Sequence, residues 1–168
     1  MHAITTSDRL VLREVTPEDA SFMNDLLNSP GFLRYIGDRG VRSDEDASKF
    51  IEEKYRAAYT QHGYGLWVVE IGDGTPVGIC GFVKRDHFEC PDLGFAFLPE
   101  HSRKGYGYEA AGAAMAYGRE TLHFEKVLAI TTPDNTASIG LLEKLGFKFE
   151  SLVDTPTGEM VRLFSFNY

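Results

Sequence analysis

The sequence predicts a mixed α/β fold in a single domain that spans residues 1–168. The chain has 168 residues, 43% of them hydrophobic, which suits one compact domain with its own core. Segments with the two-residue alternation of strands are interspersed with segments of helical spacing. Residues 92–98, DLGFAFL, are apolar at nearly every position, as expected of a central strand covered on both faces.

The first third of the chain predicts a strand followed by helices. Residues 10–15, LVLREV, alternate apolar and polar side chains, which is typical of a half-buried strand. Residues 16–19, TPED, supply a helix start with proline in the first turn. A second helix is expected over residues 44–61, where apolar side chains recur at helical spacing behind Ser43, a residue type suited to capping a helix N-terminus.

The middle of the chain predicts a hairpin and then the central strand. Residues 66–71 and 76–83 are expected to be strands joined by residues 72–75, whose two glycines permit the positive φ angles of a tight hairpin. Pro99 is expected to end the strand over residues 92–98.

The last third continues the alternation of helices and strands. The expected elements are a helix over 107–122, a strand over 126–131, a helix over 136–145 and an antiparallel pair over 147–153 and 159–167 that turns at 156–158. The residues with the most informative chemistry lie between 92 and 147.

Net charge and hydropathy indicate which kinds of partner the protein can bind, among nucleic acids, amines and membranes. The formal net charge of −8 at pH 7 argues against a protein that binds duplex nucleic acid, because such proteins present a basic surface to phosphate. A cationic or amine-bearing partner is easier to accommodate. No stretch approaches the roughly 18 consecutive apolar residues that cross a bilayer, so a soluble, cytoplasmic protein without a membrane partner is expected.

The cysteines predict neither disulfides nor a metal site. Cys80 and Cys90 are too few for a disulfide framework and are expected to be ordinary buried thiols. The segment between them contains His87 but lacks the paired, closely spaced ligands of a zinc site.

Residues 101–112, HSRKGYGYEAAG, form the most informative motif. They lie between the predicted central strand and a helix, and they combine Arg103 and Lys104 with Gly105 and Gly107. A helix N-terminus carries unpaired N–H groups and about half a positive charge, and glycine lets the backbone approach an anion closely. The motif predicts a cradle for phosphate or pyrophosphate; a glycine turn that only opens a tightly packed helix is the alternative.

Three phosphate loops compete for this pattern. The nucleotide-triphosphatase loop ends in Gly-Lys-Ser/Thr, a triplet that this chain lacks. GYGYEA fits a relaxed dinucleotide fingerprint, but Glu125 precedes the next strand, and a loop that begins at Gly105 leaves too little chain for a doubly wound domain. The pyrophosphate loop of coenzyme A-dependent N-acetyltransferases is the third.

The chain resembles the GNAT acetyltransferase superfamily, whose loop runs Gln/Arg-x-x-Gly-x-Gly/Ala after the fourth strand. Residues 102–107, SRKGYG, match it at both glycine positions and depart from it at Ser102. Four stretches resemble the branch of this superfamily that acetylates the N-termini of ribosomal proteins: residues 7–20, 34–43, 92–110 and 133–147. The resemblance implies a mixed, mostly antiparallel sheet flanked by helices, with acetyl-CoA as co-substrate and an amine as acceptor.

The resemblance also implies the residues that bind the coenzyme. The backbone of Phe97 and Leu98 would hydrogen-bond the pantetheine arm as an added strand does. N–H groups of the loop would hold the pyrophosphate, from Arg103, Lys104, Gly105, Tyr106, Gly107 and Tyr108; both tyrosine side chains are expected to pack rather than act as acids. In such families the central strand splays from its neighbour, and a backbone N–H there polarises the acetyl carbonyl.

Asp92 is the predicted catalytic base. It occupies the place where relatives often carry a glutamate, just before the Leu-Gly of the central strand. A lysine-like amine has a pKa of about 10.4, so some group must accept its proton. Because aspartate is one methylene shorter than glutamate, a water relay is expected; a solvated aspartate at the strand entry is the alternative.

Ser138 is the predicted catalytic acid. Many members of the superfamily carry a tyrosine acid at the position of Leu142, and Ser138 lies four residues earlier, on the same helical face. In the resembling branch this serine is the proposed proton donor to the thiolate, whereas a hydrogen bond within the first helical turn is the alternative. Asn135 is expected to cap the helix and, with Ser138, to contact the coenzyme.

The acceptor is the least determined part of the reaction. The resemblance places its selection on residues 22–46 and 84–91. Acidic side chains there are either a site for the amine or, as we expect, solvated loop charge: Asp38, Asp44, Glu45, Asp46, Asp86 and Glu89. Protein N-termini, polyamines, aminoglycosides and amino acids all remain open.

Two other functions fit the same motifs. An acyl-CoA-sensing module would keep the cradle without turnover, and a protein-interaction domain would use the glycine loop only as scaffold. The sensing module predicts coenzyme binding without thiol release, and the interaction domain predicts no coenzyme binding. The oligomeric state is open.

Overall fold

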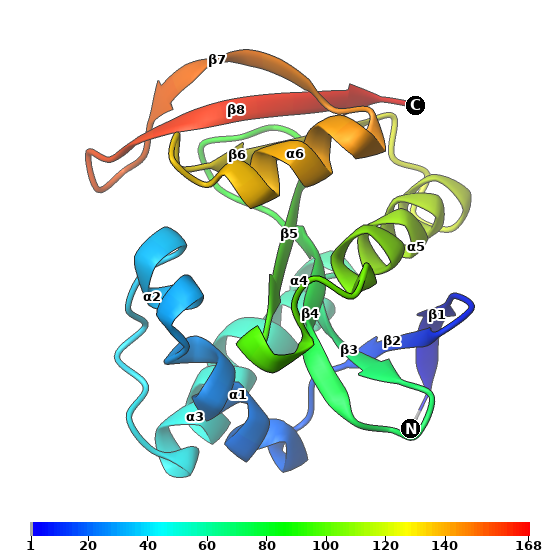
Figure 1. Ribbon diagram of the computed structural model, residues 1–168, viewed down its shortest axis with the longest axis vertical. Coiled ribbons are helices and arrows are strands. Elements are labelled where there is room, and N and C mark those ends of the chain that lie inside the picture. Colours follow the sequence, from blue (N-terminus) through cyan, green and yellow to red (C-terminus); the bar gives the residue numbers. More distant parts are fainter. Residues whose placement is uncertain (1) are drawn as a thin grey trace.

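The computed structural model describes residues 2–168 and contains one eight-stranded sheet between two groups of helices (Figure 1). The strands are β1 (Ala3–Thr6), β2 (Leu10–Glu14), β3 (Leu66–Ile71), β4 (Pro76–Val83), β5 (Asp92–Phe97), β6 (Lys126–Thr131), β7 (Lys148–Asp154) and β8 (Met160–Asn167). The α-helices are α1 (Ala20–Leu27), α2 (Pro30–Tyr35), α3 (Asp44–Phe50), α4 (Ala57–His62), α5 (Tyr106–Glu120) and α6 (Thr136–Leu145). A π-helical segment, Ile51–Arg56, joins α3 to α4, and short 3₁₀ turns occupy Pro17–Asp19 and Pro99–His101.

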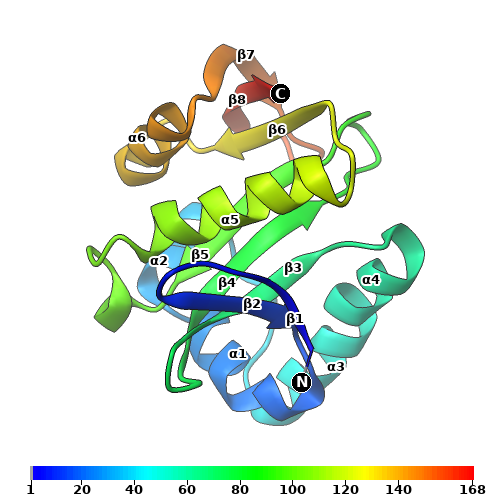
Figure 2. The ribbon, with the colours of Figure 1, turned by 90° about the vertical axis from the view of Figure 1, so that its right-hand side faces the viewer.

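The sheet has the strand order β1-β2-β3-β4-β5-β6-β8-β7. Neighbouring strands are antiparallel except β5 and β6, which are parallel. A parallel pair requires a crossover connection, which α5 supplies. In Figure 2, α5 lies across one face of the sheet, and it contacts β4 and β5. The predicted mixed, mostly antiparallel sheet is confirmed.

One hydrophobic core lies between α5, α6 and the sheet. The α5 helix contributes Ala110, Ala111 and Ala114, all fully buried, and their small side chains let the helix approach the sheet closely. Opposite them, β3 and β4 supply Trp67 and Phe82, whose rings meet edge to face with centroids 6.1 Å apart. This core fixes α5, and therefore the loop before it, against the end of β5.

A second core covers the other face of the sheet. Met23 of α1 and Ile51, where α3 ends, pack there with Val68 of β3. Val68 points to this core while both of its neighbours in β3 point to the first, as the two-residue period of a strand requires. Helices α1 to α4 therefore form a wall on the side of the sheet opposite α5.

A buried ion network ties β2 to α1 and β3. The Arg13 guanidinium donates to both carboxylate oxygens of Asp19, at 2.9 and 2.8 Å, and to Glu70 of β3 at 2.9 Å. The side chains of Arg13 and Asp19 are only 7% and 8% exposed. Buried charges are stable only when paired, so this network fixes the path of the chain from β2 into the first helix.

Most predicted elements are confirmed. Strands β3, β4 and β6 and helix α6 have the expected bounds, and Ser43 caps α3 by accepting the Asp46 N–H at 3.0 Å. Three features were not predicted: β1, α2 and the π-helical segment. β1 is a short, polar edge strand and α2 has six residues, so neither carries a long periodic pattern.

Candidate active site

Strands β5 and β6 pair only where β5 begins. Within residues 2–168, their one register pair is Asp92 with Leu128, whose N–H donates to the Pro91 carbonyl at 2.9 Å. Beyond this point β5 stays with β4 while β6 stays with β8, so the two strands diverge (Figure 1). The sheet therefore opens at its centre and leaves one edge of β5 unpaired, which is the splay that the resemblance implies.

The unpaired edge of β5 exposes backbone groups at alternate residues. The Leu98 N–H donates to Val77 at 3.0 Å, and the Leu98 carbonyl accepts the His101 N–H at 3.0 Å. Because backbone groups alternate sides along a strand, those of Phe95 and Phe97 point to the open edge. Phe97 thus presents its backbone as predicted, whereas both groups of Leu98 are already engaged, and Phe95 adds a position that was not predicted.

A cavity of about 1120 Å³ occupies this opening. Residues 92–97 of β5 and 129–131 of β6 line it, together with Asn135, Ser138 and Leu142 of the α6 segment. The opposite wall comes from α2, the helix from α3 to α4 and the end of β4. Pockets for small ligands usually have volumes of roughly 300–1,000 Å³, so this cavity has room for a coenzyme arm and a second substrate.

Residues 102–108 form a tight turn into the N-terminus of α5. Arg103 and Gly105 have φ angles of 62° and 80°, in the left-handed region that few non-glycine residues adopt. In the part of the chain that the structure describes, the N–H groups of residues 103–108 donate to no protein acceptor. Unpaired N–H groups at the start of a 15-residue helix favour an anion, so the geometry is that of the predicted cradle.

Residues near the N-terminus brace this turn. Arg9 donates from Nη1 to the Lys104 carbonyl at 2.9 Å, and its guanidinium lies 4.7 Å from the centre of the Tyr106 ring. Glu109 of α5 accepts from Arg9 Nε at 2.7 Å, from the Arg9 N–H at 2.9 Å and from the Ser7 hydroxyl. Neither Arg9 nor Glu109 was predicted, because a contact across 100 positions leaves no local pattern in the sequence.

The other side chains of the turn have structural contacts. Tyr106 and Tyr108 lie outside the cavity. Tyr106 packs against the core between α5 and the sheet, as expected, whereas Tyr108 is 42% exposed, with Lys144 Nζ 4.2 Å from the centre of its ring. Ser102, which departs from the family pattern, lines the cavity and donates its hydroxyl to Pro99 at 2.7 Å.

Gly107 keeps the space between α5, β5 and α6 open. A Cβ atom at this residue would lie 2.9 Å from a methyl carbon of Leu141 and 3.7 Å from a ring carbon of Phe97. A Cβ at Gly112, further along the same helix, would meet nothing within 4 Å. The contact with Leu141 therefore restricts residue 107 to a very small side chain, and Gly112 is under no such restriction.

The Asp92 carboxyl is buried at the point where β5 and β6 meet. Its side chain is 3% exposed, and Oδ2 accepts from Arg85 Nε at 2.5 Å. Burial raises the pKa of Asp92 to about 6, and the charges of Arg85 and His87 oppose this rise. The alternative of a solvated aspartate is wrong. Asp92 lines the cavity, and Oδ1 accepts no hydrogen bond from residues 2–168, so this oxygen is available to a water or an amine.

Helix α6 brings Ser138 to the wall of the same cavity. Asn135 caps the helix, with Oδ1 accepting the Ser138 N–H at 3.2 Å, as predicted. The Ser138 hydroxyl makes no hydrogen bond within the described structure, so a purely local role in the first turn finds no support. Leu142, one turn further on, is fully buried and lines the same cavity.

The predicted acceptor region contributes only part of the cavity wall. Residues of α2 and residues 84–85 line the cavity, as the predicted acceptor region requires. Residues of the helical stretch 50–62 also line it, and this stretch was not predicted to take part in acceptor selection. None of the six acidic residues singled out in the sequence lines it, and two of them, Asp38 and Asp46, bond instead to Arg42. Asp38, Asp86 and Glu89 lie in loops, as expected, whereas Asp44, Glu45 and Asp46 form the first turn of α3. The charged side chains that do line the cavity are Arg39, Glu53, Lys54, Lys84, Arg85 and Asp92.

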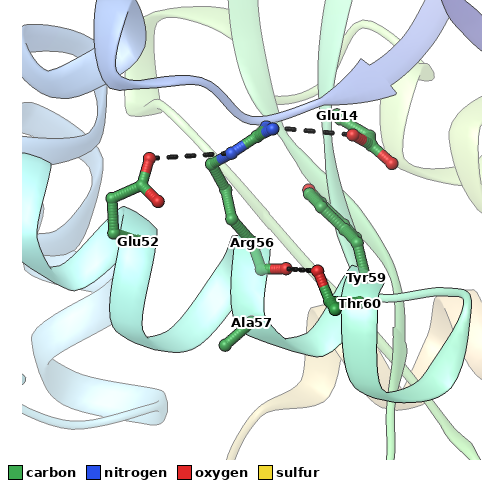
Figure 3. A pocket seen from close by; sticks show the side chains of 6 residues that line it. All are labelled: Glu14, Glu52, Arg56, Ala57, Tyr59 and Thr60. Atoms are coloured by element: carbon green, nitrogen blue, oxygen red, sulfur yellow. Dashed lines mark hydrogen bonds and ion pairs between the residues drawn. The ribbon is translucent and has the colours of Figure 1, made fainter.

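A smaller hollow of about 500 Å³ lies between β2 and the helix that ends in α4 (Figure 3). Arg56 pairs there with Glu52 at 3.6 Å and with Glu14 at 3.8 Å, and it also donates to the Val15 carbonyl at 2.8 Å. Its polar groups therefore bind the helix to the sheet, and we assign it a structural role.

The cysteines and the metal-ligating residues add no second centre. Cys80 is fully buried, which raises the pKa of its thiol to about 12, and Cys90 is half-buried. Among residues 2–168, no three His, Cys, Asp or Glu side chains come together as a metal site would require.

No helix in that range has both the length and the apolar character needed to cross a bilayer.

Solved structures share this architecture. An acetyltransferase from Agrobacterium tumefaciens superposes with a TM-score of 0.82 at 23% identity and covers 98% of this chain and 94% of its own. RimL, a ribosomal L7/L12 α-N-protein acetyltransferase in complex with coenzyme A, superposes with a TM-score of 0.84 at 16% identity, covering 99% and 98%. At these identities the likeness establishes the fold.

Sequence comparisons extend the likeness from fold to family. The protein named uncharacterized N-acetyltransferase YoaA of Bacillus subtilis is 30% identical over 156 residues, which is 91% of this chain and 87% of that protein. The [ribosomal protein uS5]-alanine N-acetyltransferase of Escherichia coli is 34% identical over 76 residues, 44% of this chain and 39% of its own. The acetyltransferase (GNAT) domain family matches residues 9–148, so the chain belongs to the GNAT acetyltransferase family.

Proposed function

We propose that the protein transfers the acetyl group of acetyl-CoA directly to a primary amine. The observation that carries this proposal is the arrangement along β5. A turn with unpaired N–H groups lies beyond its C-terminal end, an open edge follows the residues after Asp92, and a buried carboxyl lies at its first residue. A cytoplasmic location, a single domain over residues 1–168 and the identity of the amine remain predictions.

The coenzyme would lie along the open edge of β5. The N–H groups of residues 103–108 would bind the pyrophosphate, with Arg103 and Lys104 adding positive charge. The backbone of Phe97 would hydrogen-bond the pantetheine arm, in place of the strand that β6 does not provide there. The Phe95 N–H, two residues closer to Asp92, would then point toward the acetyl carbonyl and stabilise the developing oxyanion.

Asp92 would remove the proton that the amine must lose. The amine nitrogen attacks the thioester carbonyl, a C–N bond forms, and the C–S bond breaks to release a thiolate. Oδ1 of Asp92, directly or through one water, takes a proton from the attacking nitrogen. A carboxyl with a pKa of about 6 is largely ionised at neutral pH, yet it is a stronger base than a solvated aspartate.

Ser138 would return a proton to the thiolate, so Ser138→Ala should slow acetyl transfer while coenzyme binding persists. We expect kcat to fall by about tenfold or more, because the leaving group loses its donor. The dissociation constant for acetyl-CoA should change by about twofold or less, since the cap from Asn135 uses the Ser138 backbone. Stopped-flow thiol release and isothermal titration calorimetry measure the two quantities.

Thr136→Ala is the matched control, because it removes a hydroxyl from the same helical turn at an exposed position outside the cavity. It should leave both kcat and binding close to the wild-type values. Equal losses of rate and of acetyl-CoA affinity in Ser138→Ala would instead indicate a structural role for this serine.

The coenzyme half of the proposal is tested by thermal unfolding with acetyl-CoA, CoA, NAD and no ligand. A ligand at 100 times its dissociation constant stabilises the folded state by about 2.7 kcal/mol. For a domain of this size the midpoint should rise by roughly 5 to 10 °C with acetyl-CoA and with CoA, but not with NAD. If millimolar acetyl-CoA leaves the unfolding midpoint unchanged, the start of α5 does not bind the coenzyme, and the proposed reaction is excluded.

A further inference from the structure

The Arg85 side chain contacts the buried carboxyl of Asp92 and lines the same cavity. Its Nε donates to Asp92, its side chain is 36% exposed, and it lines the cavity. Within residues 2–168, neither terminal nitrogen of this guanidinium has a hydrogen-bond partner. An arginine carries five donors in a rigid plane, so donors remain beside the predicted base after Asp92 is bound.

The backbone that carries Arg85 is held in place. The Arg85 carbonyl accepts from Lys84 Nζ at 2.9 Å and from the Phe88 N–H at 3.2 Å. Lys84 Nζ also donates to the Phe88 carbonyl at 2.5 Å, so the segment after β4 closes on itself. The Arg85 side chain is therefore held at both ends, at its backbone by this turn and at its guanidinium by Asp92. This preorganises the guanidinium to bind a ligand.

This placement restricts the chemistry of the acceptor. An amine that gives its proton to Asp92 must lie within hydrogen-bond reach of that carboxyl or one water away. The remaining donors of Arg85 then lie near the carbon next to the amine. An oxygen on that side satisfies them, and a carbonyl or carboxylate one carbon from the nitrogen supplies it. Alkyl amines and polyamines have no such oxygen, and a second ammonium there would meet the charge of Arg85.

We propose that Arg85 selects the acceptor by binding the carbonyl or carboxylate oxygen of an α-amino acyl group while Asp92 takes the proton from its amine. The inference rests on the proposed acetyl transfer and adds to it a residue and a substrate class. A free amino acid supplies a carboxylate, and a peptide N-terminus supplies an amide carbonyl. Arg85 binds the common oxygen in both.

The test uses matched amines in three series, with the side chains of alanine, leucine and phenylalanine. Each series contains the free L-amino acid, its amide and the decarboxylated amine, namely ethylamine, isopentylamine or phenethylamine; spermidine is added as a polyamine. In the wild type, the acid or the amide should exceed the decarboxylated amine at least about tenfold in kcat/KM in one series or more. Preference for the acid identifies a carboxylate, and preference for the amide identifies a peptide-like carbonyl.

Arg85→Gln should remove this preference. The ratio between the acyl acceptor and its decarboxylated partner should fall to about threefold or less, mainly through a higher KM for the acyl acceptor. Acetyl-CoA affinity should be unchanged, because Arg85 is remote in sequence from the cradle and makes no contact with it in residues 2–168.

The pH profile separates selection from a merely structural effect. The charged and titratable groups that act on Asp92 are Arg85, His87 and the Tyr64 hydroxyl. Losing the positive charge of Arg85 raises the pKa of Asp92, so the acid limb of kcat/KM should move to higher pH in Arg85→Gln. Arg85→Lys retains the charge without the planar donors, so it should return the limb toward its wild-type position without restoring the preference.

Three results would overturn the inference: equal rates for acyl and decarboxylated partners in the wild type, turnover of spermidine alone, or an unchanged preference in Arg85→Gln. Each of these leaves acetyl transfer intact. Failure of the proposed function looks different, since acetyl-CoA would then bind without thiol release against any of the ten amines.

Discussion

Asp92→Asn should lower kcat/KM for amine acetylation by about 100-fold or more, the largest loss expected from any single change in the cavity. The substitution keeps the size of the side chain and leaves an oxygen that can accept from Arg85, but it removes the negative charge and the ability to take a proton. Acetyl-CoA affinity should stay within about threefold of wild type, because the cradle lies beyond the other end of β5. Steady-state thiol release and calorimetry measure the two effects.

The pH profile of the wild-type enzyme is a second test of Asp92 as the catalytic base. Burial raises the pKa of Asp92 to about 6, so the active ionised form is lost as the pH falls through that value. We expect kcat/KM to decrease below about pH 6 as Asp92 is protonated. Asp92→Asn should lose this limb. A variant with the wild-type rate and an unchanged acid limb would exclude Asp92 from the mechanism.

Gly107→Val should abolish the stabilisation by acetyl-CoA and CoA. A Cβ at this position already lies 2.9 Å from Leu141, and the two further methyl groups of valine would fill the space between the start of α5, Phe97 and α6. The backbone N–H groups of the cradle would then be less accessible to pyrophosphate. The rise in the unfolding midpoint, roughly 5 to 10 °C in the wild type, should fall below about 1 °C.

Gly112→Val is the matched control, because it places the same side chain on the same helix where nothing lies within 4 Å of the Cβ. Both variants exchange glycine for valine inside α5, so the change in intrinsic helix propensity is similar in the two and does not distinguish them. The ligand-induced rise should survive only in Gly112→Val. An undiminished rise in Gly107→Val would return this glycine to a scaffold role.

The parts of the fold that repeat locally could be predicted from the sequence. β4 and α6 follow from the two-residue and helical periods, and Asn135 from the chemistry of a cap. The glycine spacing at residues 105 and 107 predicted a cradle at the start of α5, where the structure has unpaired N–H groups, because a helix N-terminus needs little beyond its own backbone to bind an anion.

The parts that depend on contacts distant in sequence could not be predicted. Arg9 and Glu109 meet across 100 positions to brace the turn at Lys104, and no local pattern records such a contact. For the same reason, the sequence does not reveal where β5 and β6 stop pairing. That point is set by the contact between Asp92 and Leu128, which are far apart in the sequence. Sequence spacing placed Asp92 at the entry to a strand but left its burial, and therefore its pKa, open.

The acidic residues of the predicted acceptor region do not attract the amine into the cavity, in agreement with the sequence analysis. They lie outside the cavity, and Asp38 and Asp46 pair with Arg42. Near the carboxyl of Asp92 the neighbouring charge is instead the cation of Arg85. This arrangement supports the proposal that the acceptor is selected by the group beside the amine and not by the charge of the amine itself.

The central claim is tested most directly by one measurement: the amounts of free CoA thiol and of N-acetylated product formed from acetyl-CoA and the matched amine series, by absorbance and mass spectrometry. The account predicts equal molar amounts of the two products, saturation with the amine, and at least about a 100-fold slower rate in Asp92→Asn. Binding of acetyl-CoA without amine-dependent thiol release would contradict it and would identify a module that senses acyl-CoA without catalysing transfer.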